Sequence, residues 1–187
     1  LLRLKQLLLL IPLFLLVACA PVTTHYVKVE RHLALHDPLR ADTVIEKEEP
    51  RYGSNSRLLY FLDRGLSLSL SGRYQESNQM LDRAAQLADQ LYTQSLTRHA
   101  AALLTNDNIL PYEGDDFERV LIHSIAALNY AQMGLPDDAL VECRRVDTKL
   151  NAINDRYHDK KNRYKEDAFA RYLAGILYEA RGETNDA

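Results

Sequence analysis

From Arg57 onward, apolar residues recur every three or four positions, which is the spacing of one face of an α-helix. This pattern predicts a long helix over residues 74–105. Asp115 and Glu118 form an acidic capping box, so a second helix is predicted to begin at Asp115. Proline fits the first turn of a helix, and a third helix is therefore predicted from Pro136 to about residue 157.

One stretch of this region imitates a strand. Leu66, Leu68 and Leu70 alternate with serine residues, which is the period of a half-buried strand. The neighbouring leucines keep the helical spacing and a turn is expected at Gly72, so we predict a helix here as well.

Three segments of the chain share an internal repeat, which becomes visible when they are aligned on Gly72, Gly134 and Gly182. Each has a small residue seven positions before the glycine and a large residue four positions before it. The remaining matches follow the glycine. The matching residues are Gly65, Leu68, Tyr74, Ser77, Leu81 and Ala84 in the first segment, Ala127, Tyr130, Ala139, Cys143 and Val146 in the second, and Gly175, Tyr178 and Ala187 in the third.

This pattern resembles the tetratricopeptide repeat (TPR), a pair of antiparallel helices. The resemblance implies an all-α fold of helical hairpins, an α-solenoid-like arrangement. The glycines are 62 and 48 residues apart, whereas a regular TPR repeats about every 34 residues. We therefore expect a compact variant with irregular spacing and lengthened second helices. Residues 111–123 and 164–175 are also similar to a little-characterised family of bacterial envelope lipoproteins with TPR-like cores, which implies fold and location but no chemistry.

The first 19 residues have the layout of an export signal. Arg3 and Lys5 precede a nearly pure apolar run over residues 7–17. A spanning helix needs about 20 apolar residues, so this run is short for a membrane span. Residues 16–19 read Leu-Val-Ala-Cys and resemble the bacterial lipobox, which implies lipid (palmitate-type acyl chains) on Cys19. The alternative is an ordinary signal peptide cleaved near Ala20.

Three segments are therefore predicted along the chain. Residues 1–19 are a lipoprotein signal peptide, residues 20–53 a flexible tether with one short helical stretch around residues 27–35, and residues 54–187 a TPR-like domain that is incomplete at its C-terminal end. Proline and glycine residues and a run of charges interrupt the tether. His25, His32 and His36 lie in it and are predicted to be surface residues. The chain has no initiator methionine and stops inside a predicted helix, so we expect a longer protein.

Composition narrows the class of partner. Apolar residues make up 47% of the chain and charged residues 26%, which is ordinary for a globular protein. The formal net charge of −3 disfavours nucleic acid as a partner, because phosphate binding needs clustered Lys and Arg. No metal or cofactor is expected, since Cys143 is interpreted as a buried free thiol and the close ligand spacing of a zinc site is absent from the sequence.

Carboxylates gather before the second predicted helix and suggest an enzymatic alternative. Two carboxylates a few ångströms apart are the machinery of glycosidases. The same residues also suit helix capping at the positive end of the helix dipole. We favour capping and predict no enzymatic activity. This candidate functional loop contains Tyr112, Glu113, Asp115, Asp116 and Glu118.

The TPR resemblance places a partner-binding groove along the first helices of the hairpins. The groove is expected to be largely apolar and to receive an apolar helix or peptide, or the chain's own tether or a further C-terminal segment. Its predicted residues are Leu62, Leu66, Leu70, Leu121, Ser124, Leu128, Gln132, Tyr172, Ile176 and Glu179.

Together these patterns predict a lipid-anchored periplasmic scaffold that binds other envelope proteins. The residue after Cys19 is Ala20 rather than Asp, which by resemblance favours the outer membrane, facing the periplasm, over the inner membrane. Two alternatives remain open at this point. One is an envelope enzyme acting on glycan or peptide through the carboxylates of residues 113–118, and the other is a structural subunit of an envelope assembly.

Overall fold

The structure is a computed structural model that describes residues 24–98, 110–157 and 166–183. The predicted all-α class is confirmed in these residues, which form eight helices and no strand. The helices are α2 (Thr24–Ala34), α3 (Pro38–Lys47), α4 (Glu49–Tyr52), α5 (Arg57–Leu70), α6 (Tyr74–Arg98), α7 (Asp116–Gln132), α8 (Pro136–Tyr157) and α9 (Ala168–Ala180).

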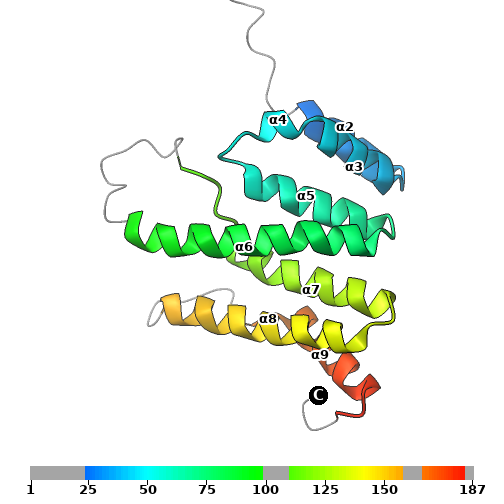
Figure 1. Ribbon diagram of the computed structural model, residues 1–187, viewed down its shortest axis with the longest axis vertical. Helices are drawn as coiled ribbons and strands as arrows, with labels where there is room; N and C mark the ends of the chain where they lie inside the picture. Colours follow the sequence, from blue (N-terminus) through cyan, green and yellow to red (C-terminus); the bar gives the residue numbers. More distant parts are fainter. Residues whose placement is uncertain (1–23, 99–109, 158–165, 184–187) are drawn as a thin grey trace, which may run out of the picture.

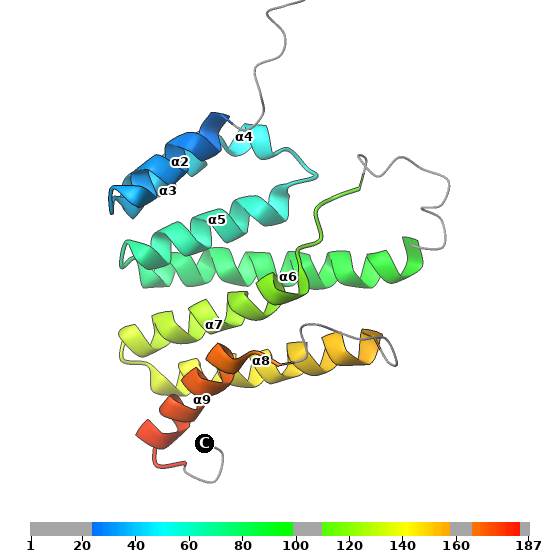
Figure 2. The ribbon, with the colours of Figure 1, turned by 180° about the vertical axis from the view of Figure 1, so that it is seen from behind.

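The helices are stacked in chain order along the long axis of the molecule (Figure 1). Helices α2 and α3 pack together, as do α5 with α6 and α7 with α8. Helix α3 packs on α5, and α6 packs on α7, so the pairs are joined into one stack. Helix α9 contacts both α7 and α8, and Figure 2 shows it crossing α8 on the side opposite to that of Figure 1.

The helix ends follow local sequence signals. The predicted capping box at Asp115 and Glu118 is present, and the Glu118 carboxylate accepts a hydrogen bond of 2.8 Å from the Asp115 N–H. Helix α8 begins at Pro136 and ends at Tyr157, as predicted. The alternating leucines lie within helix α5. The predicted end of the long helix near Thr105 lies outside the described residues.

The repeated glycines occupy the turns predicted for them. Gly72, Gly134 and Gly182 all have φ between 72° and 78°, a left-handed conformation that side chains disfavour. In each turn the N–H after the glycine donates to the carbonyl oxygen five residues earlier, and the glycine N–H donates to the carbonyl oxygen three residues earlier. These are the paired hydrogen bonds of a Schellman motif, which satisfy carbonyl groups at the end of a helix.

A fourth turn of the same kind joins α2 to α3, and histidine takes the glycine position. His36 has φ 57°, its N–H donates to the Leu33 oxygen, and the Asp37 N–H donates to the His32 oxygen at 2.9 Å. Histidine is among the residues that tolerate this conformation best after glycine and asparagine. A repeat aligned on glycine does not include this turn, so the sequence pattern did not predict it.

Small residues allow paired helices to approach closely. The residues five positions after the turn residues of the three helix pairs are Ala41, Ser77 and Ala139, and all three are completely buried. A Cβ atom built on Gly65 would lie 2.6 Å from Leu81 Cδ2, so α5 and α6 are in contact there. The Ser77 hydroxyl donates to the Gly65 carbonyl oxygen at 2.7 Å and ties the two helices together.

The prediction of a flexible tether over residues 20–53 is corrected from Thr24 onward. Helices α2, α3 and α4 occupy this stretch, and α3 packs against α5. Ala41 and Ile45 are fully buried, and His25 is 2% exposed rather than a surface residue. The polar residues of this stretch mask short amphipathic helices. Apolar residues at helical spacing cover one face of α3, while proline and charged residues take positions that helix starts and surfaces tolerate.

Buried polar contacts fasten these helices to α5. The Arg64 guanidinium donates two hydrogen bonds to the Asp42 carboxylate, from Nε at 2.8 Å and from Nη2 at 3.1 Å. Asp42 is 2% exposed, and the Arg64 side chain is 12% exposed. The Tyr52 hydroxyl donates to Asp63 at 2.7 Å. Residues 24–53 are thus part of the folded unit.

The signal peptide and Cys19 lie outside the described residues, so the structure leaves both as predictions. Within the described part of the chain, no helix combines the length and hydropathy needed to cross a membrane.

Candidate binding sites

Three predicted groove residues meet in one apolar cleft between α5 and α7. Leu62, Leu66 and Leu121 line it, and the cavity has a volume of about 140 Å³. Three further lining residues on the same two helices, Leu59, Phe117 and Ile125, were not predicted from the sequence. Leu81 and Ile122 form its floor. These eight residues are called the apolar cleft below.

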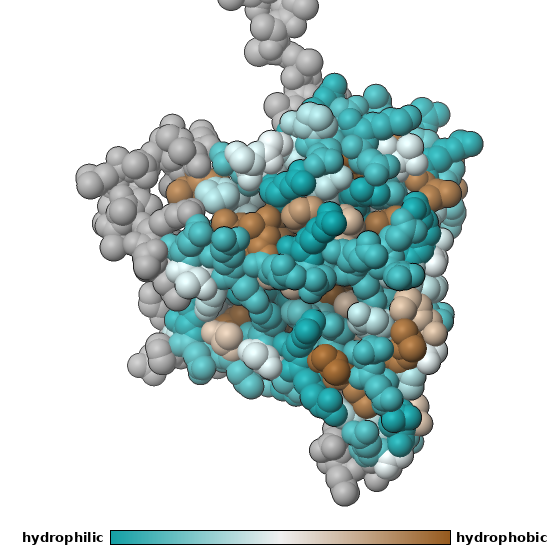
Figure 3. All heavy atoms as spheres, viewed as in Figure 1, coloured by the Kyte–Doolittle hydropathy of each residue, from teal (hydrophilic) through white to brown (hydrophobic). Residues whose placement is uncertain are grey.

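Three of the cleft residues are exposed, unlike the residues of the core. Phe117 is 48% exposed, and Leu66 and Leu121 are also exposed. The cleft positions on α5 and α7 repeat every three or four residues, so each helix presents an apolar stripe. Figure 3 shows one face of the molecule, on which apolar residues form separate patches within a mostly hydrophilic surface.

The other predicted groove residues do not join this cleft. Ser124 is buried and its hydroxyl donates to the Val120 carbonyl oxygen at 3.2 Å, which corrects its assignment to a binding surface. Leu128 is half-buried and packs against the core of α7, α8 and α9. The remaining predicted residues are exposed on α5, on α7 or on the separate helix α9, and these are Leu70, Gln132, Tyr172, Ile176 and Glu179.

The candidate functional loop is held by structural contacts. The Tyr112 hydroxyl donates to Glu118, and the Tyr112 N–H donates to the Asn55 carbonyl oxygen at 2.6 Å. Asp116 accepts a hydrogen bond of 2.7 Å from the Tyr157 hydroxyl. These contacts give carboxylates of the loop capping and tethering roles at the start of α7, as favoured from the sequence. Glu113 is half-buried, and no specific role for it follows from the structure.

Two carboxylates, Asp63 and Glu118, also line the apolar cleft. Burial raises the pKa of Asp63 to about 6, although the hydrogen bond from Tyr52 opposes this shift. The negative charge of Glu118 raises this pKa further. The apolar cleft therefore has an acidic side, which favours a ligand with a positive charge next to its apolar residues.

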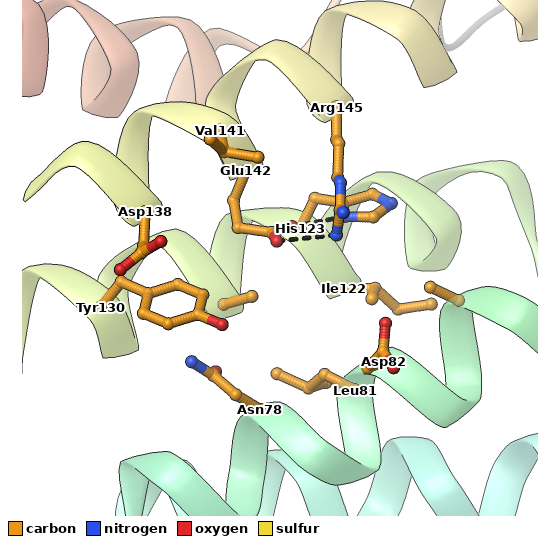
Figure 4. A pocket seen from close by; sticks show the side chains of 12 residues that line it. Asn78, Leu81, Asp82, Ile122, His123, Tyr130, Asp138, Val141, Glu142 and Arg145 are labelled. Atoms are coloured by element: carbon orange, nitrogen blue, oxygen red, sulfur yellow. Dashed lines mark hydrogen bonds and ion pairs between the residues drawn. The ribbon is translucent and has the colours of Figure 1, made fainter. Parts of the chain in front are cut away.

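A second hollow, of about 220 Å³, lies between α6, α7 and α8. Its floor contains Leu81, Ile122 and Ala126, and Asp82 on α6 and Asp138 on α8 provide acidic side chains on two walls (Figure 4). A wider hollow of about 400 Å³ shares Asp82, Ala85, His123 and Arg145 with it. The two hollows are called the polar groove below.

A buried ion-paired cluster lies in the polar groove. Glu142 is 6% exposed, and its carboxylate accepts one hydrogen bond from Arg145 Nη1 at 2.9 Å and contacts His123 Nδ1 at 2.7 Å. A carboxylate partner at Nδ1 assigns the ring proton of neutral His123 to that nitrogen. Figure 4 shows Glu142 and Arg145 projecting from α8 toward His123 on α7.

Two buried polar atoms beside the groove have no hydrogen-bond partner in the described part of the chain, His123 Nε2 and Asn78 Nδ2. Asn78 is held in place because its Oδ1 accepts from Asn129 Nδ2 at 2.8 Å. Asn129 is buried and also donates to the Ser77 hydroxyl at 2.8 Å. Buried polar atoms normally find partners, so these two mark a place where a ligand or water completes the site. No local sequence signal predicts this network, since its members are 51 or 52 residues apart along the chain.

The described residues contain no candidate metal site and no activated thiol. No group of three or more His, Cys, Asp or Glu side chains able to hold a metal ion occurs within the described ranges. Cys143 is a buried free cysteine, as predicted. Burial raises the pKa of its thiol to about 11, so the thiol stays protonated at neutral pH and is a poor nucleophile.

Comparisons of the chain with protein-family models, with curated proteins and with solved structures gave no match. The apolar cleft and the polar groove are therefore the features from which a function is proposed.

Proposed function

We propose that this chain is a protein-binding scaffold of the bacterial cell envelope, built of TPR-related helical hairpins and held by lipid on Cys19 at the outer membrane, facing the periplasm. The partners are other envelope proteins. The observation that carries the proposal is the apolar cleft, where exposed Leu66, Phe117 and Leu121 surround an open hollow. Exposed apolar residues that gather around a hollow are typical of recognition surfaces, whereas isolated ones are ordinary.

The shape and charge of the cleft suit an amphipathic helix or an extended apolar segment. The partner inserts apolar side chains between α5 and α7, and a Lys or Arg next to them faces Asp63 and Glu118. Binding of this kind buries a few anchors at the centre of the interface, and these anchors contribute most of the affinity. The lipid on Cys19 raises the effective concentration of the scaffold at the membrane.

Reversing the polarity of the cleft tests the binding proposal. A photoreactive residue is placed at Phe117 of the full-length chain in a Gram-negative host, and crosslinked partners are identified by mass spectrometry. We expect a reproducible envelope-protein adduct whose yield falls about tenfold with Leu66→Asp or Leu121→Asp, since each change removes an apolar anchor and adds a charge.

Leu39→Asp is the matched control, because Leu39 is 48% exposed on α3 and does not line the cleft. The adduct should persist in this variant. Equal adduct yields from the cleft variants, the control and the wild type would disprove partner binding at the cleft. Circular dichroism of each variant verifies that the helices remain folded.

The anchor has its own test. We expect Cys19→Ala to move the chain from the outer-membrane fraction to the soluble periplasmic fraction. Several acyl chains on Cys19 would anchor the wild type durably, and the variant has no site for them. Mass spectrometry of the wild type should find a lipid on Cys19. An unmodified Cys19, or a Cys19→Ala variant that fractionates like the wild type, would refute lipid anchoring while leaving the cleft proposal intact.

A further inference from the structure

We propose that the polar groove between α6 and α8 is a second binding site, and that it takes an alkylammonium group. Such a group comes either from a lysine side chain of a protein or from a free polyamine. The site is separate from the proposed partner-binding function: it opens between α6, α7 and α8 rather than between α5 and α7, and it shares only Leu81 and Ile122 with the apolar cleft.

The charges of the groove select a cation. In its smaller hollow, Glu142 is already compensated by Arg145. Asp82 and Asp138 remain, one on each wall. Neither forms an ion pair with any residue in the described ranges, and Asp82 accepts a hydrogen bond of 2.7 Å from the neutral Gln86 side chain. Two uncompensated carboxylates above a shared hollow attract a positive group and repel an anion.

The apolar floor of the groove favours a cation that is attached to an aliphatic chain. Leu81, Ile122, Ala126 and Val141 line the hollow together with the carboxylates. A chain of methylene groups covers such a surface while its ammonium head reaches the acidic wall, which is how lysine side chains lie on proteins. The cavity of about 220 Å³ has room for a side chain of this size.

His123 is the second, independent indication of a ligand. Its side chain is 4% exposed, Nδ1 is engaged by Glu142, and Nε2 has no partner among the described residues. When His123 is neutral, the proton on Nδ1 facing Glu142 leaves Nε2 as an acceptor, which an N–H donor complements. An ammonium group supplies three such donors, so it can bond to Nε2 and still donate to a carboxylate oxygen of the groove.

Asn78 needs a hydrogen-bond acceptor, whereas His123 Nε2 needs a donor. Its Nδ2 is a buried donor without a partner in the described part of the chain, and its Oδ1 is already bonded to Asn129. A carbonyl oxygen complements this donor. A lysine within a peptide brings such an oxygen on its backbone, whereas a polyamine leaves Nδ2 to water. The two sources of the ammonium group therefore differ at Asn78.

Calorimetric titration of the purified full chain tests the site with three probes. Cadaverine represents a free polyamine, Nα-acetyl-lysine methylamide represents a lysine within a protein, and the same compound acetylated on Nε removes the charge. We expect at least one charged probe to bind and the Nε-acetylated compound to bind at least about tenfold more weakly, because it loses the charge-assisted hydrogen bonds.

The double substitution Asp82→Asn and Asp138→Asn should abolish binding of the charged probes. Asp155→Asn is the matched control, because Asp155 is an exposed acid on α8 that does not line the groove. Preference for cadaverine identifies a polyamine site, and preference for the lysine compound identifies a protein lysine. Failure of both charged probes to bind, or equal binding by the wild type and the double variant, overturns the proposal and leaves water as the partner of His123.

Discussion

Asp42→Ala is expected to lower the free energy of unfolding by about 3 to 5 kcal/mol. The change leaves the Arg64 guanidinium, which is largely buried, without its bidentate partner between α3 and α5. Burying a charge that has lost its buried partner is costly, and this cost is what destabilises the fold. Glu46 still accepts a hydrogen bond of 3.1 Å from Arg64 Nη1, so the lower end of the range is expected.

Urea denaturation followed by circular dichroism measures this effect. Arg40→Ala is the control, since Arg40 pairs with Asp37 on the surface and its side chain is 74% exposed. Exposed pairs contribute about 0 to 1 kcal/mol. If Asp42→Ala costs no more than Arg40→Ala, the buried pair has no structural role and the attachment of α3 to α5 does not depend on it.

A double substitution tests whether the stability of the fold depends on the ion pair itself or only on avoiding an unpaired buried charge. Asp42→Leu combined with Arg64→Met replaces the pair by apolar side chains of similar size. Buried ion pairs replaced in this way often leave stability unchanged or increased. We therefore expect the double variant to be within about 1 kcal/mol of the wild type, and much more stable than Asp42→Ala alone.

The helices from α5 onward were predictable from the sequence because they carry strong local signals. Gly72 and Gly134 have no side chain, so their left-handed turns are visible as residue types. The capping box at Asp115 and Glu118 is equally local. Each of these signals depends on residues a few positions apart, and a single sequence records such spacing directly.

Helix α2 coincides with the short helical stretch expected in the tether, whereas its packing and helices α3 and α4 were missed for physical reasons. The turn between α2 and α3 uses His36, which adopts the glycine conformation without being glycine. It lies 36 residues before Gly72, close to the spacing of about 34 expected for a regular TPR. The stabilising contacts of this region, such as Asp42 with Arg64, join residues 22 positions apart. Tertiary contacts of this kind decide whether a short amphipathic stretch folds, and no local pattern reveals them.

The two candidate sites were predicted only in part for a related reason. Leu66 and Leu121 were placed correctly on one surface because both follow the helical period. Ser124 has the same spacing but is buried, since α8 packs against that side of α7. The polar groove needs three helices, and His123 meets Glu142 only when α7 and α8 pack together. The polar groove thus arises from the packing of helices against one another. The periodicity of apolar residues within one helix does not show which helices will pack together.

Ile45→Ala is expected to lower the free energy of unfolding by about 2 to 5 kcal/mol, because removing a buried aliphatic side chain loses its burial and leaves a cavity. Ile45 is fully buried in the core that includes Tyr52, Leu58 and Phe61. Leu39→Ala on the same helix removes an exposed side chain and should change stability by no more than about 0.5 kcal/mol.

These two substitutions in α3 distinguish a flexible tether from a folded segment. If residues 24–53 were a flexible tether, Ile45→Ala and Leu39→Ala would have equally small effects in urea denaturation. A large cost for Ile45→Ala alone means that α3 belongs to the folded unit, whose first described helix, α2, begins at Thr24, five residues after Cys19. If Cys19 carries the proposed lipid, a scaffold joined to it through so few residues samples a narrow zone next to the membrane, because the reach of a chain is set by the number of its residues.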